Sequence, residues 1–367
     1  MPLSHILITG GAGYIGSHTA KAVAEAGLVP VVFDNLSNGH REAAAWGPFV
    51  HGDVRDADAL QAAMFRYRVA GVIHFAGRIE VGSSAVAPDI FWDHNLNGVA
   101  ATLKAMRGAG VERIVFSSTA AVYGQPASPE PLAENDATLP INPYGDTKLA
   151  GEKLIAASCA AYGLQGIALR YFNAAGADPL GRIGEAHGDE SHLIPLAIEA
   201  ALGLRSGLTL YGTDFPTPDG SCVRDYVHVD DLASAHLLAL HLPLSADRPF
   251  LAVNLGAGRG YSVREIIDAV TQVVGRAPRV TEGPRRTGDP ALLVADISRA
   301  RTVLGWRPQT SALNTIVETA VAWRRHPAFG FGTAETLGTR RFEVKAATPV
   351  GVNQDESAPD LYSRAVG

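Results

Sequence analysis

Short apolar stretches and longer stretches of helical periodicity alternate along the first half of the chain. The apolar stretches are rich in Val, Ile and Phe and lie at residues 5–10, 29–34, 70–77, 113–118 and 167–173. The helical stretches lie at residues 17–27, 56–67, 95–110 and about 143–161. Strands that alternate with helices at this spacing form βαβ units, so the pattern predicts an α/β fold in which helices cover both faces of a parallel sheet.

The pattern changes at residue 176, where long polar stretches rich in turn-forming residues begin. The stretches "GADPLGRIGEAHGDESH" (176–192) and "GTDFPTPDGSCVRDY" (212–226) are too polar for the core of a sheet. Loops of this length in a compact domain are usually functional. Residues 227–258 are again regular and are expected to form a helix and a strand that return to the first sheet.

This organisation predicts two domains and a tail. Residues 1–175 with 227–258 are expected to form the larger α/β domain, and residues 176–226 with 259–326 a smaller α/β domain that binds substrate. Residues 331–367 have little apolar periodicity and are expected to be an appended, poorly ordered tail.

A glycine-rich turn, "ITGGAGYIG", joins the first predicted strand to the first helix. Gly10, Gly13 and Gly16 allow unusual dihedral angles and let the backbone approach a pyrophosphate at the helix N-terminus. The turn therefore predicts a Rossmann-type doubly wound parallel sheet that binds a dinucleotide. Asp34 ends the second strand, where a carboxylate accepts hydrogen bonds from ribose hydroxyls and repels a 2′-phosphate, which favours NAD over NADP.

Two acidic positions have simpler alternative interpretations. Asp34 begins a loop, so it can also act as a turn cap. Asp53 follows a third strand, where it contacts the adenine of a dinucleotide or only caps the next helix.

A second motif, "NPYGDTK", begins the helix after residue 142. Asn142 can cap this helix and Pro143 can occupy its first position, which places Tyr144 and Lys148 four residues apart on one helical face. A tyrosine that acts as a base near neutrality needs its pKa lowered by about 3, or about 4 kcal/mol. The ammonium of Lys148 and a positively charged nicotinamide can together supply this.

Hydroxyl side chains end the strand that precedes this helix, in "FSSTAAVYG". Ligands in parallel α/β sheets bind outside the carboxyl ends of the strands, so Thr119, or a neighbouring serine, is expected to hydrogen-bond the substrate oxygen that Tyr144 deprotonates. Ser117 and Ser118 are expected to be structural and to bond the backbone at the strand end.

Composition narrows the possible partners. The net charge is −6 and there is no basic tract, so nucleic acid is not an expected partner. Cys159 and Cys222 form no zinc-binding spacing, and no stretch approaches the roughly 20 apolar residues of a membrane span. We expect a cytoplasmic protein without a metal or a membrane partner.

A series of segments is similar, in order, to signatures of the extended short-chain dehydrogenase/reductase family and, within it, of the UDP-glucose 4-epimerases. They are "TGGAGYIGSH", "DNLSNGH", "GDVRD", "HFAG", "FSSTAAVYG", "NPYGDTK", "LRYFNAAGA", "GTDFPTPDGSCVRDYVHVDDLA", "NLGAG" and "RRTGDPALLVAD", which together span about residues 3–326. The resemblance implies tightly held NAD, a UDP-sugar substrate and a homodimer. It also implies reversible epimerisation at carbon 4 of the hexose through a transient 4-keto sugar and bound NADH.

The resemblance assigns roles by position. Tyr144 would be the base, Lys148 its partner and Thr119 the supporting hydroxyl. The implied cofactor-binding residues are Gly10, Gly13, Tyr14, Ile15, Gly16, Asp34, Asn35, Asp53, Val54, Phe75, Ala76, Lys148 and Phe172. The implied substrate-binding residues are Thr119, Asn173, Leu193, Tyr211, Arg224, Arg286, Asp289 and Leu293.

Several of these positions depart from the family or have alternative interpretations. Ile79 and His94 stand where many members have a lysine and an asparagine near the cofactor. Arg224 and Arg286 offer fork-shaped donors for pyrophosphate oxygens, although Arg224 can instead pair with Asp225. Leu293 is expected to set the room around the hexose 2-substituent, or else to pack in the core of the second domain.

Two other functions can be weighed against the epimerase. A nucleotide-sugar 4,6-dehydratase on this scaffold commonly has an Asp-Glu pair after the active-site threonine, whereas Ala120 and Ala121 follow Thr119 here and neither can transfer a proton. A non-catalytic NAD-sensing regulator would not need Thr119, Tyr144 and Lys148 together.

Overall fold

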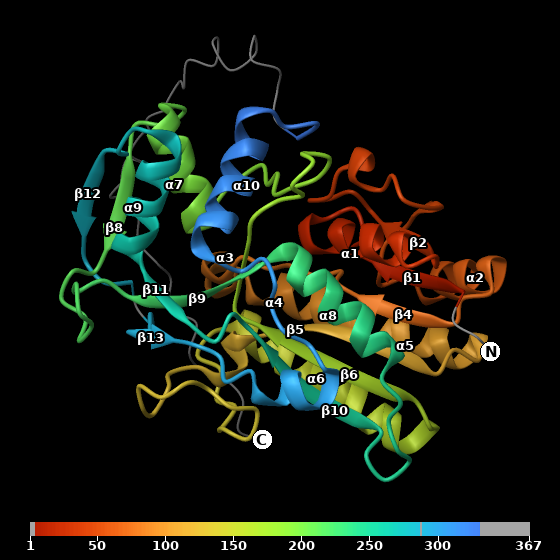
Figure 1. The fold of residues 1–367 in the computed structure, drawn as a ribbon. Coiled ribbons are helices and arrows are strands. Elements are labelled where there is room, and N and C mark those ends of the chain that lie inside the picture. The colour runs from red at the N-terminus through yellow and green to blue at the C-terminus, as the bar shows by residue number, and fades with distance from the viewer. Residues whose placement is uncertain (1–3, 287, 331–367) are drawn as a thin grey trace, which may run out of the picture. The chain divides into compact units, whose positions relative to one another are not determined.

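The computed structural model describes residues 4–286 and 288–330, and the predicted tail at residues 331–367 lies outside the described residues. Seven parallel strands form the larger sheet (Figure 1). In order across it they are β10 (Phe250–Leu255), β6 (Gln165–Tyr171), β5 (Arg113–Thr119), β4 (Gly71–His74), β1 (His5–Thr9), β2 (Val29–Asp34) and β3 (Phe49–His51). The strand order reverses between β4 and β1, which confirms the predicted Rossmann-type doubly wound sheet.

Helices cover both faces of this sheet. One face carries α1 (Tyr14–Glu25) and α8 (Val229–His241), and the other carries α2 (Ala57–Tyr67), α5 (Asn97–Ala109) and α6 (Pro143–Tyr162). Successive side chains of a strand point to opposite faces, so Ile6 and Ile8 pack with α1 and α8 while Leu7 packs with α2 and α5. Burial on both faces explains why these strands are continuous apolar stretches in the sequence.

Shorter helical segments connect these elements. They are α3 (Val81–Val86), α4 (Pro88–Phe91), the 3-10 turns at Arg41–Ala43 and Ala120–Tyr123, and the π-helical turns at Trp92–Leu96 and Ala300–Leu304. Within the described ranges, no helix is long and apolar enough to cross a membrane.

A second group of strands and helices has its own apolar core. The strands are β7 (Asn173–Ala175), β9 (Val223–His228), β11 (Gly260–Ser262) and β13 (Leu292–Leu293) in one sheet, and β8 (Leu208–Tyr211) and β12 (Val280–Gly283) in another. The helices are α7 (Leu193–Leu202), α9 (Val263–Val274) and α10 (Leu313–Arg325), which pack together through Ile198, Ile266 and Ile316. Leu304 and Trp306 pack instead in the core shared by α1 and α8. The domain boundaries given above stay a prediction.

The expectation that residues 212–226 are too polar for a sheet is wrong for their last four residues. β9 begins at Val223 and is the central strand of the second sheet. Asp225 is fully buried in it because its carboxylate accepts hydrogen bonds from the backbone amides of Ala257 (2.6 Å), Gly258 (3.0 Å) and Ala295 (3.1 Å). A charged residue enters a sheet when such donors replace its water shell.

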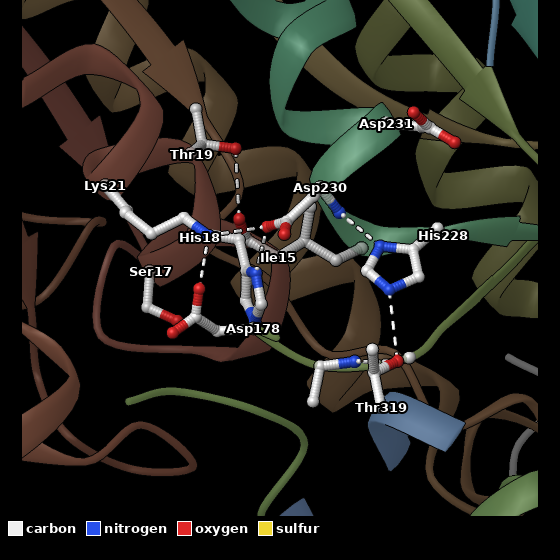
Figure 2. Close-up of polar contacts among 12 residues, drawn as sticks. Ile15, Ser17, His18, Thr19, Lys21, Asp178, His228, Asp230, Asp231 and Thr319 are labelled. Carbon is white, nitrogen blue, oxygen red and sulfur yellow. Dashed lines mark hydrogen bonds and ion pairs between the residues drawn. The ribbon is translucent and has the colours of Figure 1, made fainter. Parts of the chain in front are cut away.

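A buried charged network joins α1 to α8 and to the loop after β7. Figure 2 shows Lys21 of α1 between Asp178 of the loop and Asp230 of α8, at 2.8 and 2.9 Å, and His18 beside Asp230 at 2.7 Å. Burial raises the pKa of Asp230, but hydrogen bonds from His18 and Lys21 outweigh it and lower that pKa to about 2. The network therefore holds α1, the helix that follows the glycine-rich turn, against α8 and the loop after β7.

Replacing Lys21 by Met is expected to lower the free energy of unfolding by about 1.5–3 kcal/mol, because it removes the cation that two neighbouring carboxylates share. The side chains of Lys21 and Asp178 are only 8% and 1% exposed, so water replaces little of the lost contact, while Arg182 still holds Asp178 at 2.7 and 2.9 Å. Arg264→Met, which breaks the exposed pair with Glu282, is the control and should cost about 0–1 kcal/mol.

Denaturant titration above pH 5 measures this difference. The stabilisation by Asp230 is complete above the unfolded pKa of about 3.9 and falls as the pH drops towards 2, so the loss should shrink in acid. Equal losses in the two variants would show that the network contributes no more than a surface pair.

Candidate active site

The glycine-rich turn connects the carboxyl end of β1 to the N-terminus of α1. Gly10 has a φ of 70°, and a Cβ at this residue would lie 2.7 Å from the amide nitrogen of Ala76. A Cβ at Gly16 would lie 2.2 Å from the carbonyl oxygen of Gly10. Within the described residues, no side chain caps the start of α1. Its free amides and its dipole suit an anion that lies against the turn.

Asp34 stands where β2 ends, beside the turn. One carboxylate oxygen accepts a hydrogen bond from the amide of Ala12 at 3.0 Å and the other from the amide of Leu36 at 2.8 Å. Burial raises the pKa of Asp34, although these backbone donors oppose the rise. Asp34 thus caps a turn and lines a cavity at the same time, so its role toward a ribose stays a prediction.

Asp53 does not cap the next helix. The cap of α2 is Asp56, which accepts hydrogen bonds from the amides of Asp58 and Ala59. Asp53 instead pairs with Arg55 at 2.8 Å and accepts a bond from Asn35 at 3.4 Å. The simpler interpretation of Asp53 as a helix cap is therefore wrong.

Tyr144 and Lys148 lie on α6 as the sequence predicts. Asn142 caps the helix through the amide of Gly145 at 2.8 Å, and Pro143 is its first residue. The ammonium of Lys148 donates to the carbonyl oxygen of Ser117 at 2.9 Å and lies 5.9 Å from the centre of the Tyr144 ring. The end of β5 thus fixes the lysine behind the tyrosine.

The protein side chains alone do not give Tyr144 the lowered pKa that base catalysis needs. Burial raises the pKa of Tyr144 to about 12, and a hydrogen bond with Thr119 opposes this rise only in part. Burial also lowers the pKa of Lys148 to about 8. A further positive charge beside the phenol would favour its ionised form near neutrality.

The side chains of the two serines before Thr119 do not bond the backbone as predicted, and Ser117 lines the same cavity as Thr119. Ser117 accepts a hydrogen bond from the hydroxyl of Tyr171, and Ser118 donates one to Glu152. Glu152 in turn forms a buried two-pronged pair with Arg170 at 2.6 and 2.9 Å. These bonds fix the end of β5 to α6 and β6. The side chain of Thr119 takes no part in them and lines the cavity.

A cavity of about 390 Å³ connects the glycine-rich turn to Thr119 and Tyr144. The predicted site residues that line it are Gly10, Gly13, Tyr14, Ile15, Gly16, Asp34, Asn35, Val54, Phe75, Ala76, Thr119, Tyr144, Phe172 and Asn173. Ile79 and His94, the two departures from the family, line it as well. Two sites far apart in the sequence are thereby brought into one cavity.

Most of the remaining predicted residues form a second cluster around β9. Arg224 pairs with Asp289 at 2.7 Å, so the predicted alternative of a pair with Asp225 is wrong. The guanidinium of Arg286 lies 4.1 Å from the centre of the Tyr211 ring. Leu293 neighbours Arg224 across β13 and β9. Of the other three predicted residues, Leu193 is the first residue of α7, and Asp53 and Lys148 are described above.

Sequence reasoning missed several residues that line the cavity. Besides Ser37, Asn38 and Arg78, these include Glu185, His187 and His192 from the long polar loop after β7. The loop's length indicated a function, and the recurrence of Glu and His at residues 185, 187, 190 and 192 was the signal that could have identified them.

Comparison with known proteins agrees with this geometry. The model of the NAD dependent epimerase/dehydratase family matches residues 6–256. The chain is 48% identical over 328 residues to the UDP-glucose 4-epimerase of Halalkalibacterium halodurans, an alignment that covers 89% of this chain and 98% of that protein.

Solved structures give the same result. The UDP-glucose 4-epimerase of Brucella ovis in complex with NAD matches with a TM-score of 0.84 and 47% identity, covering 87% of this chain and 98% of that one. The enzyme of Bifidobacterium longum in complex with NAD⁺ and UDP matches with a TM-score of 0.84 and 34% identity, covering 89% and 100%. The chain therefore belongs to the NAD dependent epimerase/dehydratase family.

Proposed function

We propose that this protein catalyses the reversible inversion of carbon 4 in a UDP-hexose, UDP-glucose or UDP-galactose, through a transient 4-keto sugar. The observation that carries this proposal is the single cavity in which the glycine-rich turn, Thr119 and Tyr144 meet. A cofactor held by the turn and a sugar hydroxyl held by Thr119 and Tyr144 would share that cavity. The similarity to UDP-glucose 4-epimerases over nearly their whole length supports the same reaction.

The residues of the turn fit NAD. A Cβ at Gly10 or Gly16 would collide with backbone atoms, so the chain keeps the turn closely folded and its surface open to a phosphate. Asp34 at the end of β2 suits a ribose with a free 2′-hydroxyl. NAD, when bound, supplies the acceptor and donor of hydride and a positively charged ring.

Tyr144 would accept the proton of the sugar 4-hydroxyl and return it after the keto sugar has rotated to present its opposite face. Thr119, which bonds Tyr144, is placed to hold the same substrate oxygen. The carbonyl oxygen of Ser117 fixes the ammonium of Lys148. This places a hydrogen-bond donor and a positive charge 5.9 Å from the centre of the Tyr144 ring.

The cluster around β9 would hold the UDP part. Arg224 and Arg286 offer bidentate donors for pyrophosphate oxygens, and Asp289 holds Arg224 in place until the phosphate binds. A firmly held UDP and a loosely held sugar allow the hexose to present either face without leaving the cavity.

The structure offers no group for dehydration at the positions that follow the active-site threonine. Ala120 and Ala121 begin a 3-10 turn, and the amide of Ala121 donates a hydrogen bond to the hydroxyl of Thr119. Neither side chain transfers a proton, which favours epimerisation over 4,6-dehydration.

The test is to incubate the NAD-loaded protein with UDP-galactose and follow sugar composition and NADH absorbance together. We expect UDP-glucose to form for many turnovers while NADH does not accumulate, since the hydride returns to the sugar. Free NADH in proportion to product would indicate a dehydrogenase, and no conversion of any UDP-sugar would favour an NAD-sensing regulator.

Substrate choice is expected to depend on Leu293. It packs against an apolar cluster that contains Ala120 and Val122, which follow Thr119, and it is only partly buried. Leu293→Gly should therefore raise kcat/KM for UDP-N-acetylglucosamine relative to UDP-glucose by about 10–200-fold, the range that a small change in an apolar pocket allows. An unchanged ratio would show that Leu293 does not border the sugar.

Two further properties complete the proposal. Val86, Ile90 and Trp92 expose apolar side chains on and after α3 and α4, which supports a homodimer. Light scattering of the purified protein tests this.

Cys159 and Cys222 are both unpaired, which supports a cytoplasmic location that cell fractionation can test.

A further inference from the structure

Four side chains from the loop between β7 and α7 converge beside the cavity. They are Glu185, His187, Glu190 and His192, and each offers one ligand atom that lies within 4.8 Å of the other three. The proposed epimerase reaction uses none of them. Two imidazoles and two carboxylates are a donor set that binds a divalent transition metal such as Zn²⁺.

The distances between these donors suit a tetrahedral ion. A tetrahedron with metal bonds of about 2.0–2.1 Å places its ligand atoms about 3.3 Å apart. The Nδ1 atom of His187 lies 3.2 Å from Oε1 of Glu185 and 3.7 Å from Oε2 of Glu190, and that of His192 lies 3.2 Å from Oε1 of Glu190, the other oxygen of that carboxylate. The contact of His192 with Glu185, at 2.5 Å, needs to lengthen by less than 1 Å.

The backbone around the cluster is anchored from outside the loop. Trp323 of α10 donates its indole N–H to the carbonyl oxygen of Glu185 at 2.8 Å, and His40 bonds the carbonyl oxygen of Ala186 at 2.7 Å. Within the loop, Glu190 accepts bonds from the amides of Ser191 (2.7 Å) and His192 (2.8 Å). These bonds hold the donors near one another before an ion binds, which reduces the cost of ordering them.

The two carboxylates are largely buried, so their ionised forms are stable only beside positive charge. The side chains of Glu185 and Glu190 are 7% and 8% exposed, so they lie side by side with little water. Two protonated imidazoles can neutralise them, and one divalent ion bound by neutral imidazoles gives the same net charge. Metal binding therefore adds no uncompensated charge beside the two buried carboxylates, and the side chain of His192, which is 46% exposed, lies at the open side of the cluster.

We propose that Glu185, His187, Glu190 and His192 form a binding site for one Zn²⁺ ion. Four protein ligands close the coordination shell, so the ion is structural and acts on no substrate bond. It fixes the loop whose Glu185, His187 and His192 form part of the cavity wall.

The experiment uses the full chain without a histidine tag, loaded with NAD, stripped by a chelator and titrated with ZnCl₂ by calorimetry. We expect one tight site per chain. His187→Gln and Glu190→Gln, checked for fold by circular dichroism, should each weaken it by more than the roughly 10–100-fold that loss of an outer-shell partner costs. The matched control is His326→Gln, at an exposed histidine after α10, and it should bind as the wild type does.

Titration with CoCl₂ tests the geometry separately. Intense visible absorption, typical of four-coordinate Co²⁺, is expected for the wild type and its absence for His187→Gln. Weak bands of octahedral Co²⁺ in the wild type would overturn the tetrahedral site. Zn²⁺ binding that is equally tight in the wild type and in His187→Gln/His192→Gln would overturn the site itself and leave the cluster as a set of ion pairs.

Discussion

Replacing Tyr144 by Phe is expected to lower the turnover of UDP-sugars by about 10²–10⁴-fold, the contribution that a positioned acid-base group makes. The change removes one oxygen and keeps the ring, so packing on α6 is preserved. The change also removes the hydrogen bond with Thr119, worth about 1 kcal/mol. Bound NAD and the unfolding transition should therefore stay close to those of the wild type.

The matched control for this variant lies on the same helix. Tyr162→Phe removes a hydroxyl from an exposed ring at the last residue of α6, where its ring contacts Arg107, and should leave the rate unchanged. Steady-state kinetics, with NAD content measured after denaturation, compare the two variants. A Tyr144→Phe enzyme that keeps a tenth or more of wild-type turnover would exclude Tyr144 as the base.

The pKa of Tyr144 connects this result to the cofactor. Burial raises that pKa to about 12 in the protein alone, and Lys148 does not offset the rise. The positively charged nicotinamide is then the remaining source of the positive charge that an ionised phenol needs. A positive ring would lower the pKa of the phenol, so the phenolate would form while the cofactor is oxidised and the phenol would keep its proton once hydride has been transferred. This suits a cycle in which proton and hydride leave the sugar together.

The larger sheet could be predicted from the sequence because each of its main strands is buried on both faces. Ile6, Leu7 and Ile8 show this, since their alternate side chains enter two different cores and the apolar stretch is continuous. The cap by Asn142 and the position of Tyr144 could also be predicted, because both depend on residues a few positions apart.

What could not be predicted depends on contacts between distant parts of the chain. β9 looked too polar for a sheet because the donors that satisfy Asp225 come from residues 257, 258 and 295. Ser118 finds Glu152 on α6 rather than nearby backbone. The Glu and His side chains of residues 185–192 converge because Trp323 and His40 hold their loop, and no local pattern contains that information.

Replacing Gly16 by Ala is expected to weaken NAD binding by about 100-fold, or about 2.8 kcal/mol. Gly16 is buried in the first turn of α1, and its added Cβ would lie 2.2 Å from the carbonyl oxygen of Gly10. That oxygen cannot move away freely, because it accepts a hydrogen bond from the amide of Gly13 at 3.1 Å and the amide of Gly10 is held by Phe33 at 2.9 Å. The turn must therefore distort where it is expected to meet the pyrophosphate.

The control for Gly16→Ala is Gly82→Ala in α3, where an added Cβ meets no atom within 4 Å. NAD retained after purification, followed by titration of the stripped protein with NAD, measures both variants. Overpacking should also cost Gly16→Ala about 1–3 kcal/mol of stability, so binding is compared at a temperature where both variants are folded. If Gly16→Ala held NAD as firmly as Gly82→Ala does, the backbone of this turn would not be what binds the cofactor, and the assignment of the turn as the dinucleotide site would fail.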